Sequence, residues 1–163
     1  MKELARTIAL LNHKDQMYGQ HPYIFHLDMV VNVLTLAGEI DDVLISAGYL
    51  HDTIEDTSMT YEIIAEVFNK RIADIVQAVS NAGSFEETAA NIDRAGLMAA
   101  TVKTADRIAN LIMSTTTKNT PTLKKYVSED SIFSAHVLKN VQNAGMIASY
   151  MELVKLANWM LEN

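Results

Sequence analysis

Apolar residues recur at helical spacing along most of the chain, and the stretches end at residues that interrupt helices. A first helix is predicted over about 2–18, where the segment from Gly19 to Pro22 ends it. The apolar stripe of this helix consists of Leu4, Ile8, Leu11 and Met17. A second helix is predicted over about 24–37, and Gly38 ends it.

The third predicted helix covers about 42–54 and begins after Asp41, a residue type that caps helix N-termini well. Its stretch from Val43 to Leu50 is apolar on nearly every side. A helix of that kind has no face suited to water, so we expect it to be central and buried.

The rest of the chain is also predicted to be helical, apart from a polar, Thr-rich loop over Ser114–Pro121. The predicted helices run over about 60–69, over about 70–81, from Ser84 to about Met113 with room for one interruption, and over about 122–161 with a break near 138–140. Ser84 and Glu87 have the spacing of a capping box. No alternation of strand length recurs, so we expect an all-α fold.

The composition agrees with this interpretation and excludes several kinds of chemistry. The 163 residues include only 6 Gly and 2 Pro, which favours few, long elements. At 49% hydrophobic residues the chain can bury a core, and we expect a single domain over residues 1–163. The absence of Cys excludes disulfides, Cys-ligated zinc, iron–sulfur clusters and thiol nucleophiles.

The net charge of −7, without a basic run, disfavours a nucleic-acid polymer as partner. The chain has neither an apolar leader at its start nor an apolar run of membrane-spanning length. We therefore expect no membrane association and a cytoplasmic location. The sequence leaves the oligomeric state open.

The third predicted helix ends in a group of polar residues that carries the most specific chemistry. His51, Asp52, Glu55 and Asp56 follow the apolar stretch, and the pairs four residues apart point toward one end of the helix. Burying such a group is costly unless a cation compensates it. Imidazole and carboxylate together suit Mn, Fe, Zn or Ni. Two further residues of these types, His26 and Asp106, also stand in apolar helical segments.

The order His, His-Asp, Asp resembles the HD-domain metal-dependent phosphohydrolases. A closer resemblance is to the hydrolase domains of RelA/SpoT homologues and to the small stand-alone (p)ppGpp hydrolases. The matching segments are Pro22–His26, Leu50–Thr57 and Val102–Asn110, while His13 and Gln16 are similar to the family's His-x-x-Gln segment. The resemblance covers about residues 5–130 and implies a compact HD-domain helical bundle of about seven to nine helices.

Residue by residue, the resemblance implies a set of functional roles. The metal ligands would be His26, His51, Asp52 and Asp106, holding Mn²⁺ or another divalent cation. Glu55 and Asp56 would be the catalytic acidic pair that handles the attacking water. The substrate-binding residues would be Asn110, Lys103, Arg107, Lys124, Lys125 and Tyr126.

The implied activity is that of a nucleotide phosphohydrolase, with (p)ppGpp 3′-pyrophosphohydrolase as the leading assignment. The chain ends where a synthetase domain would begin, so hydrolysis without synthesis is implied. Three positions depart from the family pattern: Tyr18 replaces a basic residue, Leu27 replaces Pro and Thr104 replaces Leu. These departures keep open another HD nucleotide phosphohydrolase, such as a 5′-nucleotidase or an NADPH-type 2′/3′-phosphatase. A non-catalytic nucleotide-binding HD protein is the alternative of a different class.

Other conspicuous residues are assigned ordinary structural roles. We expect Trp159 and the methionines to be core or packing residues. His13, His21 and His136 are expected to be surface or capping residues.

Overall fold

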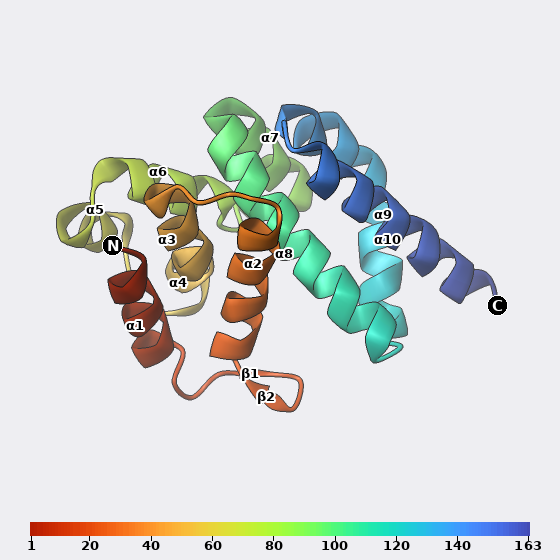
Figure 1. Cartoon of the computed structure of the whole chain (residues 1–163), viewed down its shortest axis with the longest axis horizontal. Helices are drawn as coiled ribbons and strands as arrows, with labels where there is room; N and C mark the ends of the chain where they lie inside the picture. The colour runs from red at the N-terminus through yellow and green to blue at the C-terminus, as the bar shows by residue number, and fades with distance from the viewer.

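The computed structural model describes residues 1–163 and is built almost entirely of helices (Figure 1). The helices are α1 (Lys2–Asn12), α2 (Ile24–Leu36), α3 (Asp42–Leu50), the single-turn α4 (Thr53–Asp56), α5 (Tyr61–Val67), α6 (Lys70–Val79), α7 (Phe85–Ala95), α8 (Leu97–Thr116), α9 (Thr120–His136) and α10 (Ala144–Glu162), with a 3-10 turn at Leu138–Asn140. Nine of these helices are longer than one turn, so the predictions of an all-α fold and of seven to nine helices are confirmed.

The predicted first helix is too long, because α1 ends at Asn12. The chain then forms a small hairpin of two strands with two residues each. In it β1 (Met17–Tyr18) pairs antiparallel with β2 (His21–Pro22), so that Tyr18 lies opposite His21. Gly19, at the turn of this hairpin, has a φ of +61°, which glycine adopts without strain. The hairpin brings Tyr18 to the N-terminal end of α2.

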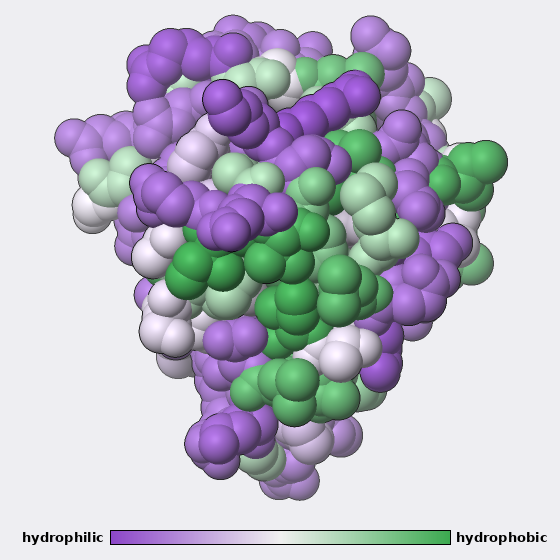
Figure 2. All heavy atoms as spheres, turned by 90° about the vertical axis from the view of Figure 1, so that its left-hand side faces the viewer, coloured by the Kyte–Doolittle hydropathy of each residue, from purple (hydrophilic) through white to green (hydrophobic).

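Two residues of the apolar stripe of α1 face outward, while a third, Ile8, packs against the core. Leu4 and Leu11 are 49% and 62% exposed, whereas Ala5 and Ala9 are fully buried. The alanines let α1 pack closely on α3, which leaves Leu4 and Leu11 on the other face. Figure 2 views the molecule from this side and shows apolar atoms gathered in the middle of the face.

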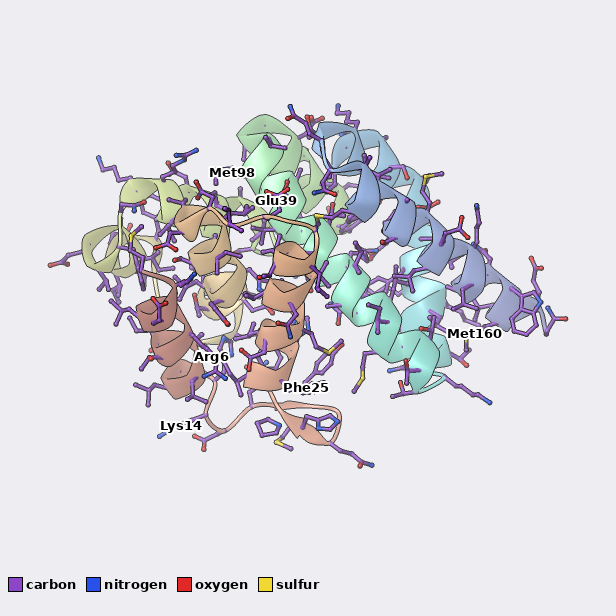
Figure 3. All side chains as sticks on the ribbon, in the orientation of Figure 1. Arg6, Lys14, Phe25, Glu39, Met98 and Met160 are labelled. Atoms are coloured by element: carbon purple, nitrogen blue, oxygen red, sulfur yellow. The ribbon has the colours of Figure 1, made fainter.

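Helix α1 is also held to α2 by an ion pair. The Arg6 guanidinium donates through Nε and Nη2 to the two carboxylate oxygens of Asp28, at 2.8 and 2.7 Å. Arg6 projects from α1 toward α2 in Figure 3. This bidentate contact fixes the helix that precedes the hairpin relative to the helix that follows it.

Helix α3 is central, as predicted, and the Asp41 side chain caps it by accepting from the N–H groups of Val43 and Leu44. It packs so closely on α2 that a methyl group added at Gly48 would lie 3.0 Å from a terminal carbon of Leu34. The predicted extension to residue 54 is wrong, because the helix ends at Leu50. The chain turns at His51 and Asp52 before α4 begins.

Helix α8 runs through the middle of the molecule and touches α2, α3, α6, α7, α9 and α10. It is longer than predicted, because the Thr-rich segment continues the helix to Thr116 and the loop covers only 117–119. The hydroxyls of Thr115 and Thr116 donate to the carbonyls of Leu111 and Ile112 within the same helix, so these residues need no loop to satisfy them. One contiguous core of 32 buried residues surrounds α8.

The capping position at Ser84 is confirmed, since its hydroxyl accepts from the N–H of Glu87 and begins α7. Trp159 on α10 is 61% exposed, so it is not a core residue. None of the helices combines the length and the apolar character that crossing a membrane requires.

Candidate metal centre

Three buried side chains from three helices meet near the middle of the molecule. His26 lies on α2, His51 follows the last residue of α3, and Asp106 lies on α8. One nitrogen or oxygen atom from each lies within 4.8 Å of the others. The Oδ1 atom of Asp106 is 3.3 Å from Nε2 of His26 and 3.7 Å from Nε2 of His51. The fold therefore brings together His26, His51 and Asp106, three of the residues that the sequence marked as candidate metal ligands.

Asp52 lies beside this cluster. Its Oδ2 atom is 2.9 Å from Nε2 of His51 and 3.7 Å from Nε2 of His26. The same oxygen accepts a hydrogen bond of 2.6 Å from the hydroxyl of Tyr23. Tyr23 thus holds the carboxylate against the two imidazoles, a role that the sequence did not reveal.

The hydrogen bonds of His51 fix which of its nitrogens faces the carboxylates. Its Nδ1 lies 2.8 Å from the carbonyl oxygen of Gly48, which can only accept, so Nδ1 carries the proton. In the neutral imidazole Nε2 then presents a lone pair to Asp52 and Asp106. A lone pair at 2.9 Å from a carboxylate oxygen is repelled unless a proton or a cation lies between them. The donor set therefore fits a divalent cation, and the bond to Gly48 matches the outer contact usual for metal-bound histidine.

The electrostatics of the cluster also favour a positive charge between the two imidazole rings. Burial opposes the charged form of His51, but the adjacent Asp52 carboxylate and Asp106 outweigh it and raise the pKa of His51 to about 10. Burial likewise opposes the ionised form of Asp52, yet the neighbouring His51 holds the pKa of that carboxyl well below its ordinary value. The carboxylates thus attract a positive charge to the position between the rings.

Asp106 is held from several directions. Its Oδ2 atom forms an ion pair of 3.0 Å with Nζ of Lys103. Its Oδ1 atom accepts a hydrogen bond of 2.6 Å from Nδ2 of Asn110, which is in turn bound by Tyr18. Burial alone would lower the pKa of Lys103, but the charges of Asp106 and Asp52 raise it, so the amine stays charged.

The acidic pair occupies the single turn α4 and is exposed. Oε2 of Glu55 accepts from the N–H of Asn81 at 3.0 Å, and Oδ2 of Asp56 accepts from Nε2 of Gln16 at 2.8 Å. The Oε1 atom of Gln16 lies 2.6 Å from Nδ1 of His13. His13 is buried and stacks on Tyr23, so its predicted place at the surface is wrong. The His-x-x-Gln spacing was the only sequence signal for this contact.

Most of the predicted substrate-binding residues border one cavity of about 260 Å³ beside the cluster. Its lining includes Lys103, Arg107, Lys125 and Tyr126, together with Glu55, Asp106 and Glu129. Lys124 is exposed and does not line this cavity. Asn110 lines a second cavity of about 460 Å³, which it shares with Tyr18 and which contains no Lys, Arg, Asp or Glu.

Arg107 is almost fully buried and is held mainly by other side chains. Its Nη2 atom lies 2.7 Å from Oε2 of Glu129, and its guanidinium packs against the rings of Phe85, Tyr126 and Phe133 at 4.1–4.9 Å from their centres. Its Nη1 atom has no hydrogen-bond partner. Glu129 could not be found from the sequence, because it reaches the cavity only through the packing of α9 on α8.

Comparison with known families and proteins gives a consistent result. A family model described as an HD domain matches residues 3–136. A relative from Danio rerio named guanosine-3′,5′-bis(diphosphate) 3′-pyrophosphohydrolase MESH1 is 40% identical over 115 residues, which are 64% of each chain. A Synechocystis protein named probable guanosine-3′,5′-bis(diphosphate) 3′-pyrophosphohydrolase is 33% identical over 113 residues, or 62% of this chain and 15% of that one. The match thus spans less than two thirds of either relative.

Two solved structures show that the fold recurs elsewhere. One, described as a metazoan ortholog of SpoT that hydrolyses ppGpp and plays a role in starvation responses, has a TM-score of 0.80 at 19% identity and covers 94% of this chain and 93% of its own. The protein lmo0812 from Listeria monocytogenes EGD-e has a TM-score of 0.66 at 23% identity, with 86% and 98% of the two chains covered. At these identities the likeness concerns the fold.

Proposed function

The chain belongs to the HD domain family, and from this premise we propose that it is a metal-dependent nucleotide phosphohydrolase acting on (p)ppGpp. The reaction would release pyrophosphate from the 3′ position and leave GDP or GTP. The names of the relatives from Danio rerio and Synechocystis support this substrate. The cytoplasmic location stays a prediction. The contiguous core supports our proposal that residues 1–163 form a single domain.

The observation that carries the proposal is the placement of Nε2 of His51 against the carboxylates of Asp52 and Asp106, while its Nδ1 is bound to the carbonyl of Gly48. We propose His26, His51, Asp52 and Asp106 as ligands of a divalent cation, with Mn²⁺ as the leading candidate. When bound, such a cation acidifies water and neutralises phosphoryl charge. The two imidazoles and two carboxylates would hold it without any thiolate, which this chain lacks.

Glu55 and Asp56 are proposed as the catalytic pair. Each carboxylate is anchored through one oxygen, Glu55 by the backbone of Asn81 and Asp56 by Gln16, and neither second oxygen has a hydrogen-bond partner in the chain. Their exposure gives water access to those free oxygens. The pair is thereby suited to orient the attacking water and to accept its proton.

The cavity beside Asp106 is suited to the phosphate groups. Lys103, Arg107 and Lys125 border it and would stabilise the negative charge on the 3′-pyrophosphoryl group while water attacks its phosphorus and the ribose 3′ oxygen leaves. Tyr126 closes one side, whereas Lys124 lies outside and would contribute little. Since the whole chain carries a net charge of −7, this local group of cations must attract the anionic substrate. The uncharged cavity beside Asn110 would suit the nucleoside part.

The direct test incubates the purified protein with ppGpp and Mn²⁺ and separates the products by anion-exchange chromatography. We expect equal amounts of GDP and pyrophosphate, and neither product after chelation of the metal or in Asp106→Ala. Release of inorganic phosphate alone from ppGpp, or no release at all, would contradict the assignment.

One observation favours a second candidate within the same class. The cavity that contains Tyr18 has no charged side chain to hold a second phosphorylated end. Of the other HD nucleotide phosphohydrolases, a 5′-nucleotidase would need cations at one end only, whereas an NADPH-type 2′/3′-phosphatase would also have to accommodate the diphosphate of its substrate. A panel of nucleoside mono-, di- and bis-phosphates, scored separately for phosphate and pyrophosphate, distinguishes this candidate from (p)ppGpp hydrolysis.

A further inference from the structure

Tyr18 contacts two parts of the metal centre at once, although the sequence marked it only as a departure from the family pattern. Its hydroxyl donates to Oδ1 of Asn110 at 2.8 Å, and its ring stacks on His26 with the ring centres 4.7 Å apart. We propose that Tyr18 is a positioning residue, which orients Asp106 through Asn110 and orients His26 by stacking. The inference rests on the proposed metal-binding role of Asp106 and His26.

The hydrogen bonds fix the direction of the Asn110 amide. The Tyr18 hydroxyl is the donor in its bond to Oδ1 of Asn110. As a donor it requires the oxygen of the amide, so Nδ2 of Asn110 must face the other way. That nitrogen donates to both the backbone oxygen and Oδ1 of Asp106, at 3.1 and 2.6 Å.

Asp106 is consequently held at both oxygens before any cation binds. Lys103 holds Oδ2 and Asn110 holds Oδ1, and the remaining lone pair of Oδ1 is left for the position between His26 and His51. Both N–H groups of the Asn110 amide are used in this arrangement. Asn110 therefore has no amide donor to offer a nucleotide, and its role shifts from substrate contact to support of Asp106.

The stacking contact restrains the first histidine in a similar way. The plane of Tyr18 lies at 29° to that of His26, and its edge meets the ring of Tyr23 at 6.3 Å. The Nδ1 atom of His26 is buried without a hydrogen-bond partner, so no polar contact sets the orientation of that ring from behind. The face of Tyr18 supplies this restraint instead. As a neutral residue, it does so without adding positive charge beside a cation site.

The test compares Tyr18→Phe, which keeps the ring and removes the hydroxyl, with the unaltered protein. Calorimetric titration of the metal-free proteins with Mn²⁺ alone should show binding weakened by about 10–100-fold, the usual cost of losing an outer contact of a metal site. Tyr61→Phe is the matched control, because it removes a hydroxyl that donates to a carboxylate, that of Asp74, on the distant α5 and α6.

A second variant tests whether the Tyr18 hydroxyl acts through the Asn110 amide or whether its loss disturbs the site in general. Asn110→Ala should weaken Mn²⁺ binding at least as much as Tyr18→Phe, and the double variant should be no weaker than Asn110→Ala, since the hydroxyl acts through that amide. Unaltered Mn²⁺ affinity in Tyr18→Phe with a raised KM would make Tyr18 a substrate contact and overturn the proposal. Additive losses in the double variant would overturn it as well. The titrations contain no nucleotide, so a wrong substrate assignment leaves their outcome unaffected.

Discussion

Nε2 of His51 lies 2.9 Å from Oδ2 of Asp52, although the two residues are neighbours in the sequence. In a continuous helix successive side chains point about 100° apart, so such a pair would diverge. The contact exists because α3 ends at Leu50 and the chain changes direction before α4 begins. The one helix boundary that the sequence pattern placed wrongly in this region is thus the feature that assembles the site.

This contact predicts that substitutions of Asp52 and Asp56, which are four residues apart, have different effects, because Asp52 is the proposed metal ligand and Asp56 the proposed catalytic residue. Asp52→Ala should lose bound metal, because it removes a carboxylate that faces both imidazoles. Asp56→Ala should retain the metal and lose about 10²–10⁴-fold in kcat, the typical contribution of a general base. Elemental analysis and pyrophosphate release measured on both variants provide the check. Equal loss of metal in the two would refute the division of roles.

A bound cation should also stabilise the fold. Mn²⁺ at about 100 times its dissociation constant should add about 2.7 kcal/mol to the free energy of unfolding, because the unfolded chain does not bring these residues of α2, α3 and α8 together. Thermal unfolding with and without the metal measures the effect. Asp106→Asn serves as the control, and an equal rise of its Tm with Mn²⁺ would place the binding elsewhere.

The same residues show how far sequence reasoning reaches. His51, Asp52, Glu55 and Asp56 could be grouped because they are close in sequence, and His26 and Asp106 because polar residues stood out in apolar helices. Tyr18, Gln16 and Glu129 could not be assigned contacts in this way, since each depends on a hairpin or on helix packing that leaves no periodic signal. The exposure of Leu4 and Leu11 on α1 was hidden for a related reason: the small size of Ala5 and Ala9, not apolar area, decided which face approaches α3.

The close approach of α2 and α3 yields a prediction about stability. Gly48→Ala would place a methyl group 3.0 Å from Leu34 and 3.3 Å from Val31, so overpacking should destabilise the protein by about 1–3 kcal/mol. Urea unfolding monitored by circular dichroism measures it. Shortening the opposing side chain in Gly48→Ala/Leu34→Ala should make the combined loss smaller than the sum of the single losses. If the loss in the double variant equals the sum of the two single losses, the two helices move apart instead of clashing at Leu34.

Asp93 on α7 predicts a dependence on pH away from the site. Its carboxylate accepts from Lys139 at 2.7 Å and from Asn140 at 3.0 Å, and these contacts, Lys139 first, lower the pKa of Asp93 to about 2. A lowered carboxyl pKa gives stability that is present above the ordinary value near 4 and is lost as the pH falls through 2.

The difference in unfolding free energy between the unaltered protein and Asp93→Asn should therefore shrink between pH 4 and pH 2. Urea unfolding at several pH values in this range measures the difference. A difference that stays constant would mean that the charge of Asp93 does not contribute to the contacts by which Asp93 joins α7 to the 3-10 turn.

Two adjacent lysines offer the sharpest test of which surface meets the substrate. Lys125 borders the cavity beside Asp106, whereas Lys124 is exposed outside it, so the two variants Lys125→Gln and Lys124→Gln change the net charge equally. A charge-assisted hydrogen bond to phosphate is worth about 1.5–3 kcal/mol, which corresponds to a loss of about 10–100-fold in kcat/KM. We expect that loss in Lys125→Gln alone, measured with ppGpp at low and high salt. Equal small losses that disappear at high salt would instead mean that the substrate senses only the overall field of the protein, not the cavity.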